Sequence, residues 1–198
     1  MIVKKLEDPY SKYAVAISAF KVSSPEGTAK LISSISSTGN LEDKPVKQFF
    51  NAENIATWNH LYLAAYFTVK SIKKSASNIK AVEIELLRYA SAKKQLKEAL
   101  SDFGVKMDDT SIAALLIGVG EQQVAYQMAD IMSSHGLVED LSLLDLTKEK
   151  LDRLKIIYGI GDVELTALLG GGVQYTSLMA DTMMKLIINR MSSLILKK

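Results

Sequence analysis

Residues 82–105 read VEIELLRYASAKKQLKEALSDFGV, and this stretch sets the fold class that we expect for the chain. Val82–Tyr89 is rich in aliphatic residues that alternate with glutamates, which is typical of a strand with a buried face. Ser91 stands where a helix N-cap belongs, because its hydroxyl can accept a hydrogen bond from a first-turn amide. The apolar residues that follow share helical spacing: Ala92, Leu96, Ala99, Leu100 and Phe103. The stretch therefore predicts a strand that leads into a basic amphipathic helix, which Gly104 ends in the left-handed conformation.

The rest of the chain mixes strands and helices. Short β-rich runs predict strands at residues 13–22, 46–50 and 112–119. Apolar periodicity and capping residues predict a helix that begins at Ser24-Pro25 and ends near Gly39, and further helices at 55–74, 121–134, 147–158, 162–169 and 177–196. We therefore expect an α+β fold, a single domain over residues 1–198 whose mixed or antiparallel sheet is covered by helices. Gly170–Gly172 predict a hinge, which makes residues 170–198 a hinge plus a long C-terminal helix that could dock on a partner.

Composition excludes several classes of site. The chain has 198 residues, enough to bury a core without a metal or a disulfide. It has no cysteine, which excludes disulfides, thiolate nucleophiles, iron–sulfur clusters and cysteine-ligated zinc. Its two histidines are too few for an all-histidine metal site in one chain. We expect neither a bound metal nor a cofactor.

The N-terminus lacks the long apolar core of a signal peptide. The only segment of membrane-spanning length is 175–195, and it contains Asp181, Lys185 and Arg190. Each of these charges costs about 2.5–3.5 kcal/mol near the centre of a bilayer. We therefore expect a soluble, cytoplasmic protein that has no membrane contact.

The net charge of +2 hides an asymmetry along the chain. Residues 70–106 hold nine lysines and arginines against four acidic residues, whereas residues 108–164 hold four against eleven. Such an asymmetry indicates either a polyanion-binding surface or simply a solvated charged face. The basic half is where we expect nucleic acid to bind, if it binds at all.

Glycine motifs give one weak alternative function. Gly118-Val119-Gly120 lies between a predicted strand and a predicted helix, as in a nucleotide-binding loop, but Gln123 replaces the third glycine of that motif. A close strand-to-helix turn is the simpler explanation. Gly170–Gly172 are not followed by the lysine and hydroxyl of a phosphate-binding loop. We find no catalytic constellation and expect that the protein is not an enzyme.

The last helix and the helix at 55–74 each have two apolar faces. The final helix carries two adjacent stripes, which are Met179, Met183, Leu186, Ile187 and Leu194, and Ala180, Met184, Ile188, Met191 and Ile195. They cover more of the helix than a one-sided surface helix needs, so either both are core or one of them docks on another protein. In the second case Arg190 needs an acceptor. His60 lies on the second apolar face of its helix, where a core or interface histidine is favoured over a catalytic one.

Four stretches contain motif residues of one known family. Residues 85–105 are similar to the family signature at Glu85, Tyr89, Ser91, Gln95, Ala99, Gly104 and Val105. Ala92 replaces the usual glycine of that signature, and Lys94 replaces the usual arginine. Residues 46–66 match at His60, Leu61, Leu63 and Ala64, residues 146–168 at Gly159, Ile160, Asp162, Glu164 and Leu165, and residues 186–196 at Arg190. On these residues the chain resembles the family of the small regulatory KEOPS-complex subunit related to the p53-related-protein-kinase binding protein, in its archaeal type.

The resemblance implies a non-catalytic subunit of the KEOPS tRNA-modification complex. Members of this family bind the small kinase/ATPase subunit and support threonylcarbamoylation of the adenosine next to the anticodon, and so act indirectly on the threonylcarbamoyl transferase subunit. Archaeal members are also held to recruit tRNA through its single-stranded 3′ CCA end. The competing interpretation is a structural protein-interaction adaptor that does not touch RNA.

The resemblance and the charge pattern together give two sets of candidate residues. A single-stranded RNA end is held by cations on its phosphates and by aromatic rings on its bases. The RNA-binding candidates are Lys73, Lys74, Lys93, Lys94 and Lys97 as cations, with Tyr89 and His60 as base contacts. The kinase-binding candidates are Met179, Met183, Met184, Ile187, Ile188, Arg190, Met191 and Ile195.

Overall fold

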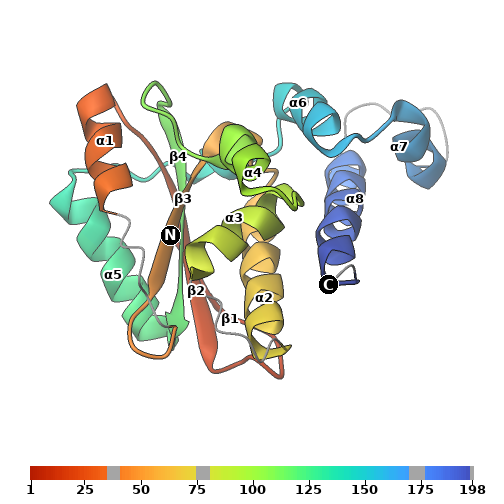
Figure 1. The fold of residues 1–198 in the computed structure, drawn as a ribbon. Coiled ribbons are helices and arrows are strands. Elements are labelled where there is room, and N and C mark those ends of the chain that lie inside the picture. The colour runs from red at the N-terminus through yellow and green to blue at the C-terminus, as the bar shows by residue number, and fades with distance from the viewer. Residues whose placement is uncertain (35–40, 75–80, 170–176, 197–198) are drawn as a thin grey trace.

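The sheet at the centre of the molecule has four antiparallel strands in the order β1-β2-β4-β3 (Figure 1). The strands are β1 (Ile2–Lys5), β2 (Tyr13–Lys21), β3 (Val46–Asn51) and β4 (Ser111–Val119). β2 pairs with β4 along its whole length, from Tyr13 opposite Val119 to Lys21 opposite Ser111. The computed structural model describes residues 1–34, 41–74, 81–169 and 177–196. The expected α+β class and the antiparallel sheet are confirmed, and β1 is an addition that the sequence did not predict.

Helices cover both faces of this sheet (Figure 1). α1 (Pro25–Ser33) and α5 (Glu121–Ser134) lie on one face, and α2 (Trp58–Lys74), α3 (Val82–Ser91) and α8 (Ser177–Leu196) lie on the other side. α4 (Leu96–Phe103), α6 (Lys148–Tyr158) and α7 (Asp162–Leu169) complete the second layer, with short 3-10 turns at Ala52–Asn54 and Leu141–Leu144. None of the described helices combines the length and apolar composition that a membrane crossing requires.

Two apolar cores form because both faces of β2 and β4 are buried. On the side of α5, Ala16, Phe20 and Leu116 pack with Val124 and Met128. On the other side, the alternate strand residues pack into a larger core with α2, α3 and α8, including Ile17, Leu115, Leu61, Leu86 and Ile187. Because successive side chains of a strand point to opposite faces, the same two strands supply both cores from alternate residues.

The predicted strand at Val82–Tyr89 is wrong, because these residues form helix α3. Val82, Leu86 and Ala90 are buried at helical i, i+4 spacing. Glu83 and Glu85 lie in the first turn, where negative charge is favourable. The alternation that favoured a strand covers only the first five residues and fits one turn of a helix equally well.

The predicted caps of the following helix are also wrong. Ser91 is the last residue of α3, and Ala92 takes the left-handed conformation, with φ 54° and ψ 24°. α4 begins only at Leu96. Gly104 has extended dihedrals, and a side chain there would bring its Cβ within 2.6 Å of the Leu100 carbonyl oxygen. Close packing, and not a left-handed turn, therefore requires this glycine.

Other predicted boundaries are confirmed. Ser24 caps α1 by accepting a hydrogen bond from the Gly27 amide at 3.2 Å, and Thr147 caps α6 through the Lys150 amide at 3.2 Å. Gly159 ends α6 in the left-handed region with φ 60°. α1 ends at Ser33 with Ser34 as its C-cap, before the predicted end near Gly39. The Gly170–Gly172 hinge lies outside the described residues.

Candidate functional site

The inner face of α8 belongs to the protein's own core. Met183, Ile187 and Met191 are fully buried where α8 packs against α2, α3, α6 and α7. In this structure these three candidates cannot contact a partner. The side chain of Ile195 lies outside the described residues.

The outer face of α8 lines a shallow groove with the beginning of α2. Ile188 and Met179 are only partly buried, and Met184 forms the wall that separates groove and core, with an exposed fraction of 7%. Thr57 Oγ1 lies 3.5 Å from Met184 Sδ and joins the two sides. The groove has a volume of about 390 Å³, and its lining residues are Thr57, Trp58, Asn59, Ala180, Asp181, Met184, Lys185 and Ile188.

Trp58 is the aromatic residue of this groove. Its ring packs edge-on against Tyr62 with the centroids 6.4 Å apart, and the Lys4 ammonium lies 4.5 Å from its centre. Sequence periodicity does not show that Trp58 borders a groove, because the second wall comes from a helix more than 120 residues away. Tryptophan is enriched at energetically important positions of protein interfaces.

Arg190 is paired with residues of its own chain. Its Nη2 lies 2.8 Å and 2.9 Å from the two carboxylate oxygens of Glu164, and its Nε donates to the Tyr158 carbonyl oxygen at 3.4 Å. The acceptor that this arginine was expected to need therefore comes from its own chain. The contacts tie α8 to α7 and to the end of α6.

The lysines predicted to bind RNA form two separate groups. Lys93, Lys94 and Lys97 lie at the α3–α4 turn, where Lys94 and Lys97 are exposed and Lys93 Nζ is 3.9 Å from Asp102. Lys73 and Lys74 lie at the end of α2, where Lys73 pairs with Glu42 at 2.9 Å.

These two groups sit at opposite ends of the sheet. The carbonyl oxygen of Asp102, beside Lys93, accepts a hydrogen bond from Asn54, which follows the strand end where Asn51 pairs with Ile112. Lys73 lies over the ring of Tyr13, which pairs with Val119 at the other end of β4. Seven residue steps of about 3.4 Å place the two ends roughly 24 Å apart.

His60 and Tyr89, the two predicted base contacts, are buried. His60 is fully buried, and its Nε2 lies 2.8 Å from the Ala90 carbonyl oxygen. Burial lowers the pKa of His60 to about 4, against the smaller opposing effect of the Ala90 hydrogen bond. Tyr89 has an exposed fraction of 1% and packs near Phe67. In this conformation neither ring can stack on a base.

The end of α2 carries aromatic residues that sequence reasoning did not select. Lys12 and Lys73 both pair with Glu42, and their ammonium groups lie 5.0 Å and 5.3 Å from the centre of the Tyr13 ring. The hydrogen bond from Lys12, followed by those from Tyr13 and Lys73, lowers the pKa of Glu42 to about 2. Tyr66 precedes Lys70 and Lys73 at helical spacing, a signal that could have identified this surface from the sequence.

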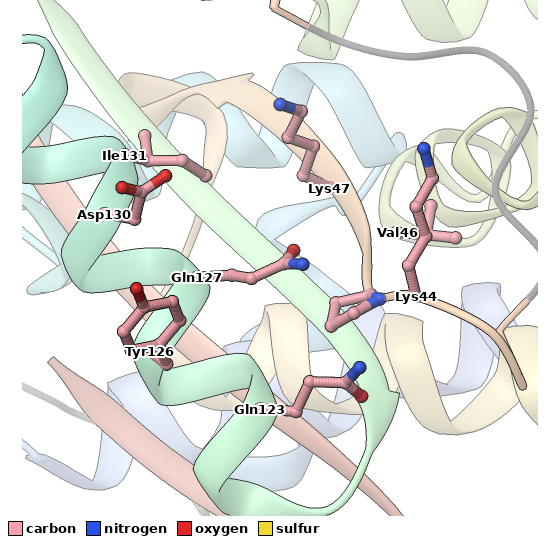
Figure 2. Close-up of a pocket in the computed structure, with 9 residues that line it drawn as sticks. Lys44, Val46, Lys47, Gln123, Tyr126, Gln127, Asp130 and Ile131 are labelled. Carbon is pink, nitrogen blue, oxygen red and sulfur yellow. The ribbon is translucent and has the colours of Figure 1, made fainter.

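Figure 2 shows a second groove, between α5 and the edge strand β3. The amides of Gln123 and Gln127 extend from α5 toward the beginning of β3. Burial lowers the pKa of Lys47, which lines the groove, and the nearby Lys44 lowers it further. Gln48 Nε2 donates to the Phe49 carbonyl oxygen at 2.8 Å. A lysine on an edge strand opposes pairing with another chain, so protection of β3 is a sufficient explanation for Lys47 in this groove.

The glycines of the Gly118–Gly120 turn have structural explanations. A Cβ on Gly118 would lie 2.9 Å from Pro45 Cγ, and Gly120 has φ 79° where β4 turns into α5. Both neighbours of β4 are antiparallel, whereas a dinucleotide loop belongs to a parallel strand–helix–strand unit. The sheet topology therefore does not provide the strand–helix–strand unit that a dinucleotide loop at this turn would need. Among the described residues no cluster of histidine and acidic side chains could hold a metal ion.

Comparison with known proteins confirms the family resemblance that the four motif stretches indicated. The sequence profile of a family described as "Kinase binding protein CGI-121" matches residues 22–194. A search of curated proteins finds no match to the sequence. The matched region contains α1 to α7, most of α8 and the whole groove around Trp58, and it excludes β1 and β2.

Proposed function

Because the chain belongs to the family of the kinase-binding protein CGI-121, we propose that it is a non-catalytic KEOPS subunit that binds the small kinase subunit of that complex. We also propose that the chain helps to recruit tRNA for threonylcarbamoylation of the adenosine next to the anticodon. The match over residues 22–194 carries the proposal, since it covers all but the two ends of the chain.

The groove between α8 and the beginning of α2 is the proposed kinase contact. Ile188 and Trp58 offer partly exposed apolar surface, and Asp181 and Lys185 supply a polar rim. An apolar centre with a charged rim is the usual arrangement of a protein–protein interface. The buried stripe of Met183, Ile187 and Met191 holds α8 rigidly on the body and so fixes the position of this surface.

A calorimetric titration of the chain with the purified small kinase subunit tests this part. We expect saturable one-to-one binding. Trp58 is the only tryptophan of the chain, so its fluorescence reports on the groove itself. A spectral change that disappears in Trp58→Phe, while calorimetric binding persists, places the kinase at the groove. Absence of heat at two temperatures, together with an unchanged Trp58 spectrum, contradicts the proposal if the kinase is active, because apolar association can have an enthalpy near zero at one temperature.

For tRNA, the proposed contacts are the exposed lysines of the α3–α4 turn, Lys94 and Lys97, with Lys93 beside them. The test compares an unmodified tRNA with the same tRNA without its three 3′ nucleotides, at one near-physiological salt concentration because phosphate contacts depend on salt. Preference for the intact tRNA supports recruitment through the CCA end. If both bind equally, CCA recognition by this chain is wrong, and if neither binds, the adaptor without RNA contact is the better description.

A further inference from the structure

One end of the molecule brings lysines and tyrosines from distant parts of the chain together. The β1–β2 connection runs below the last turn of α2, at the lower edge of Figure 1. We call this surface the basic–aromatic end, and define it by Tyr10, Lys12, Tyr13, Tyr66, Lys70, Lys73 and Lys74. Glu42 joins it from the segment that precedes β3.

The rings and ammonium groups of the basic–aromatic end contact one another. Tyr10 and Tyr66 pack edge-to-face with their centroids 5.5 Å apart, and both rings are partly exposed. Lys70 Nζ lies 5.9 Å from the Tyr66 ring centre. The surface is therefore preorganised, because the rings and Glu42 hold the lysine stems in place.

Lys70, whose ammonium group lies over the Tyr66 ring, places a positive charge beside the exposed rings. Lys12 and Lys73 share Glu42, which leaves an excess of one positive charge in that group. Within the described part of the chain, neither Lys70 nor Lys74 forms an ion pair. With Glu42, the carboxylates of the connecting segments, Glu7, Asp8 and Asp43, formally balance the four lysines, so the feature that distinguishes this end is the unpaired Lys70 and Lys74 and not a net charge.

We propose that the basic–aromatic end is a second RNA-binding surface, where lysines contact phosphates and Tyr10 and Tyr66 cover an unpaired base. Cations interleaved with exposed rings are the common device for holding single-stranded RNA. The inference rests on the proposed tRNA recruitment but concerns a different surface, roughly 24 Å along β4 from the lysines of the α3–α4 turn. Tyr10, Lys12 and Tyr13 also precede residue 22, where the family match begins.

The experiment measures the binding of fluorescently labelled tRNA, intact and without its 3′ CCA, to the full chain over a series of salt concentrations. Lys70→Ala with Lys74→Ala should weaken both tRNAs by about tenfold and lower the salt dependence by about two phosphate contacts. Tyr66→Leu should weaken binding by about fivefold or more, as expected for a lost stacking contact. Lys30→Ala with Lys148→Ala, at exposed positions of α1 and α6, removes the same charge elsewhere and should leave binding within about twofold.

Equal losses in the two double-lysine variants would show an unspecific charge effect and overturn the inference, as would binding unchanged from wild type. The same variants are tested on vesicles of anionic lipid. If wild type binds the vesicles and the Lys70→Ala, Lys74→Ala protein does not, while both bind tRNA equally, the surface binds membranes and the inference is overturned. Far-UV circular dichroism shows whether the Tyr66→Leu protein is folded. If it is not, the double-lysine variant still tests the inference. If intact and shortened tRNA bind equally, CCA recognition fails while the lysine effect still tests this surface.

Discussion

The side chains of Tyr158 and His60 meet in the core, with Tyr158 Oη 3.0 Å from His60 Nε2 and both atoms against the Ala90 carbonyl oxygen. His60 Nδ1 accepts a hydrogen bond from the Ala56 amide at 3.3 Å, so the proton of the neutral ring belongs on Nε2. The arrangement joins α2, α3 and α6 and satisfies a carbonyl in the last turn of α3. Its geometry requires an uncharged imidazole.

The neutral state of His60 makes stability depend on pH. Burial lowers the pKa of His60 to about 4, whereas an unfolded chain has a histidine pKa of about 6.5, so the unfolded state binds more protons between these values. The free energy of unfolding should therefore fall by roughly 2 kcal/mol between pH 7 and pH 5. Urea denaturation at the two pH values measures it. His60→Gln should remove most of the loss, whereas His135→Gln, at the other histidine, should retain it; equal stability of wild type at both values contradicts the assignment.

Ala92 is the one described non-glycine residue with positive φ, at 54°. An alanine in this conformation costs about 1 kcal/mol, which explains the glycine usual at this position of the family signature. Ala92→Gly should raise the free energy of unfolding by roughly 0.5–1 kcal/mol, measured by chemical denaturation. Ala125→Gly, the same change inside α5, should lower it by about 1 kcal/mol. A destabilised Ala92→Gly protein would show that the turn does not need this conformation.

Sequence patterns predicted the fold best where caps and periodicity agree. α5 and α8 have the predicted bounds, and β2 and β4 are the long apolar runs that a doubly buried strand needs. Val82–Tyr89 was mispredicted because VEIEL satisfies a period of two and, over so few residues, also one helical turn. Only packing decides such a case, and α2 against α3 decided it for the helix.

The candidate surfaces were harder to predict, because they depend on which helical faces meet. Arg190 and Glu164 were both singled out, but no periodicity shows that they pair across two helices. The two apolar faces of the helix that contains His60 left its location open, and only the structure shows α3 and α6 closing over it. The separation of Lys73 from Lys97 follows from sheet register, which a single sequence does not reveal.

The ion pair between Arg190 and Glu164 should hold α7 on α8. Both side chains are about one third exposed, so solvent screens the pair and we expect a coupling of only about 1 kcal/mol. A double-mutant cycle with Arg190→Met and Glu164→Gln measures this coupling by chemical denaturation. Amide hydrogen exchange in α7 should accelerate in either single variant. A coupling near zero would mean that apolar contacts such as Leu165 alone hold α7 in place.

A substitution at Ile188 tests the proposed kinase contact without disturbing the buried core. Ile188→Asp places a carboxylate on the partly exposed wall of the groove, so we expect kinase affinity to fall by tenfold or more with little loss of stability. Asn189→Asp introduces the same carboxylate one position along, at an exposed site, and should bind the kinase normally.

Met183→Asp tests the buried inner face of the same helix. Met183 is fully buried, so a carboxylate there should unfold the chain, which circular dichroism detects. Calorimetric titration of the folded variants then decides the role of the outer face. If Ile188→Asp and Asn189→Asp both bind like wild type, the outer face of α8 does not contact the kinase, because no other change is as well placed to exclude an apolar partner from this groove.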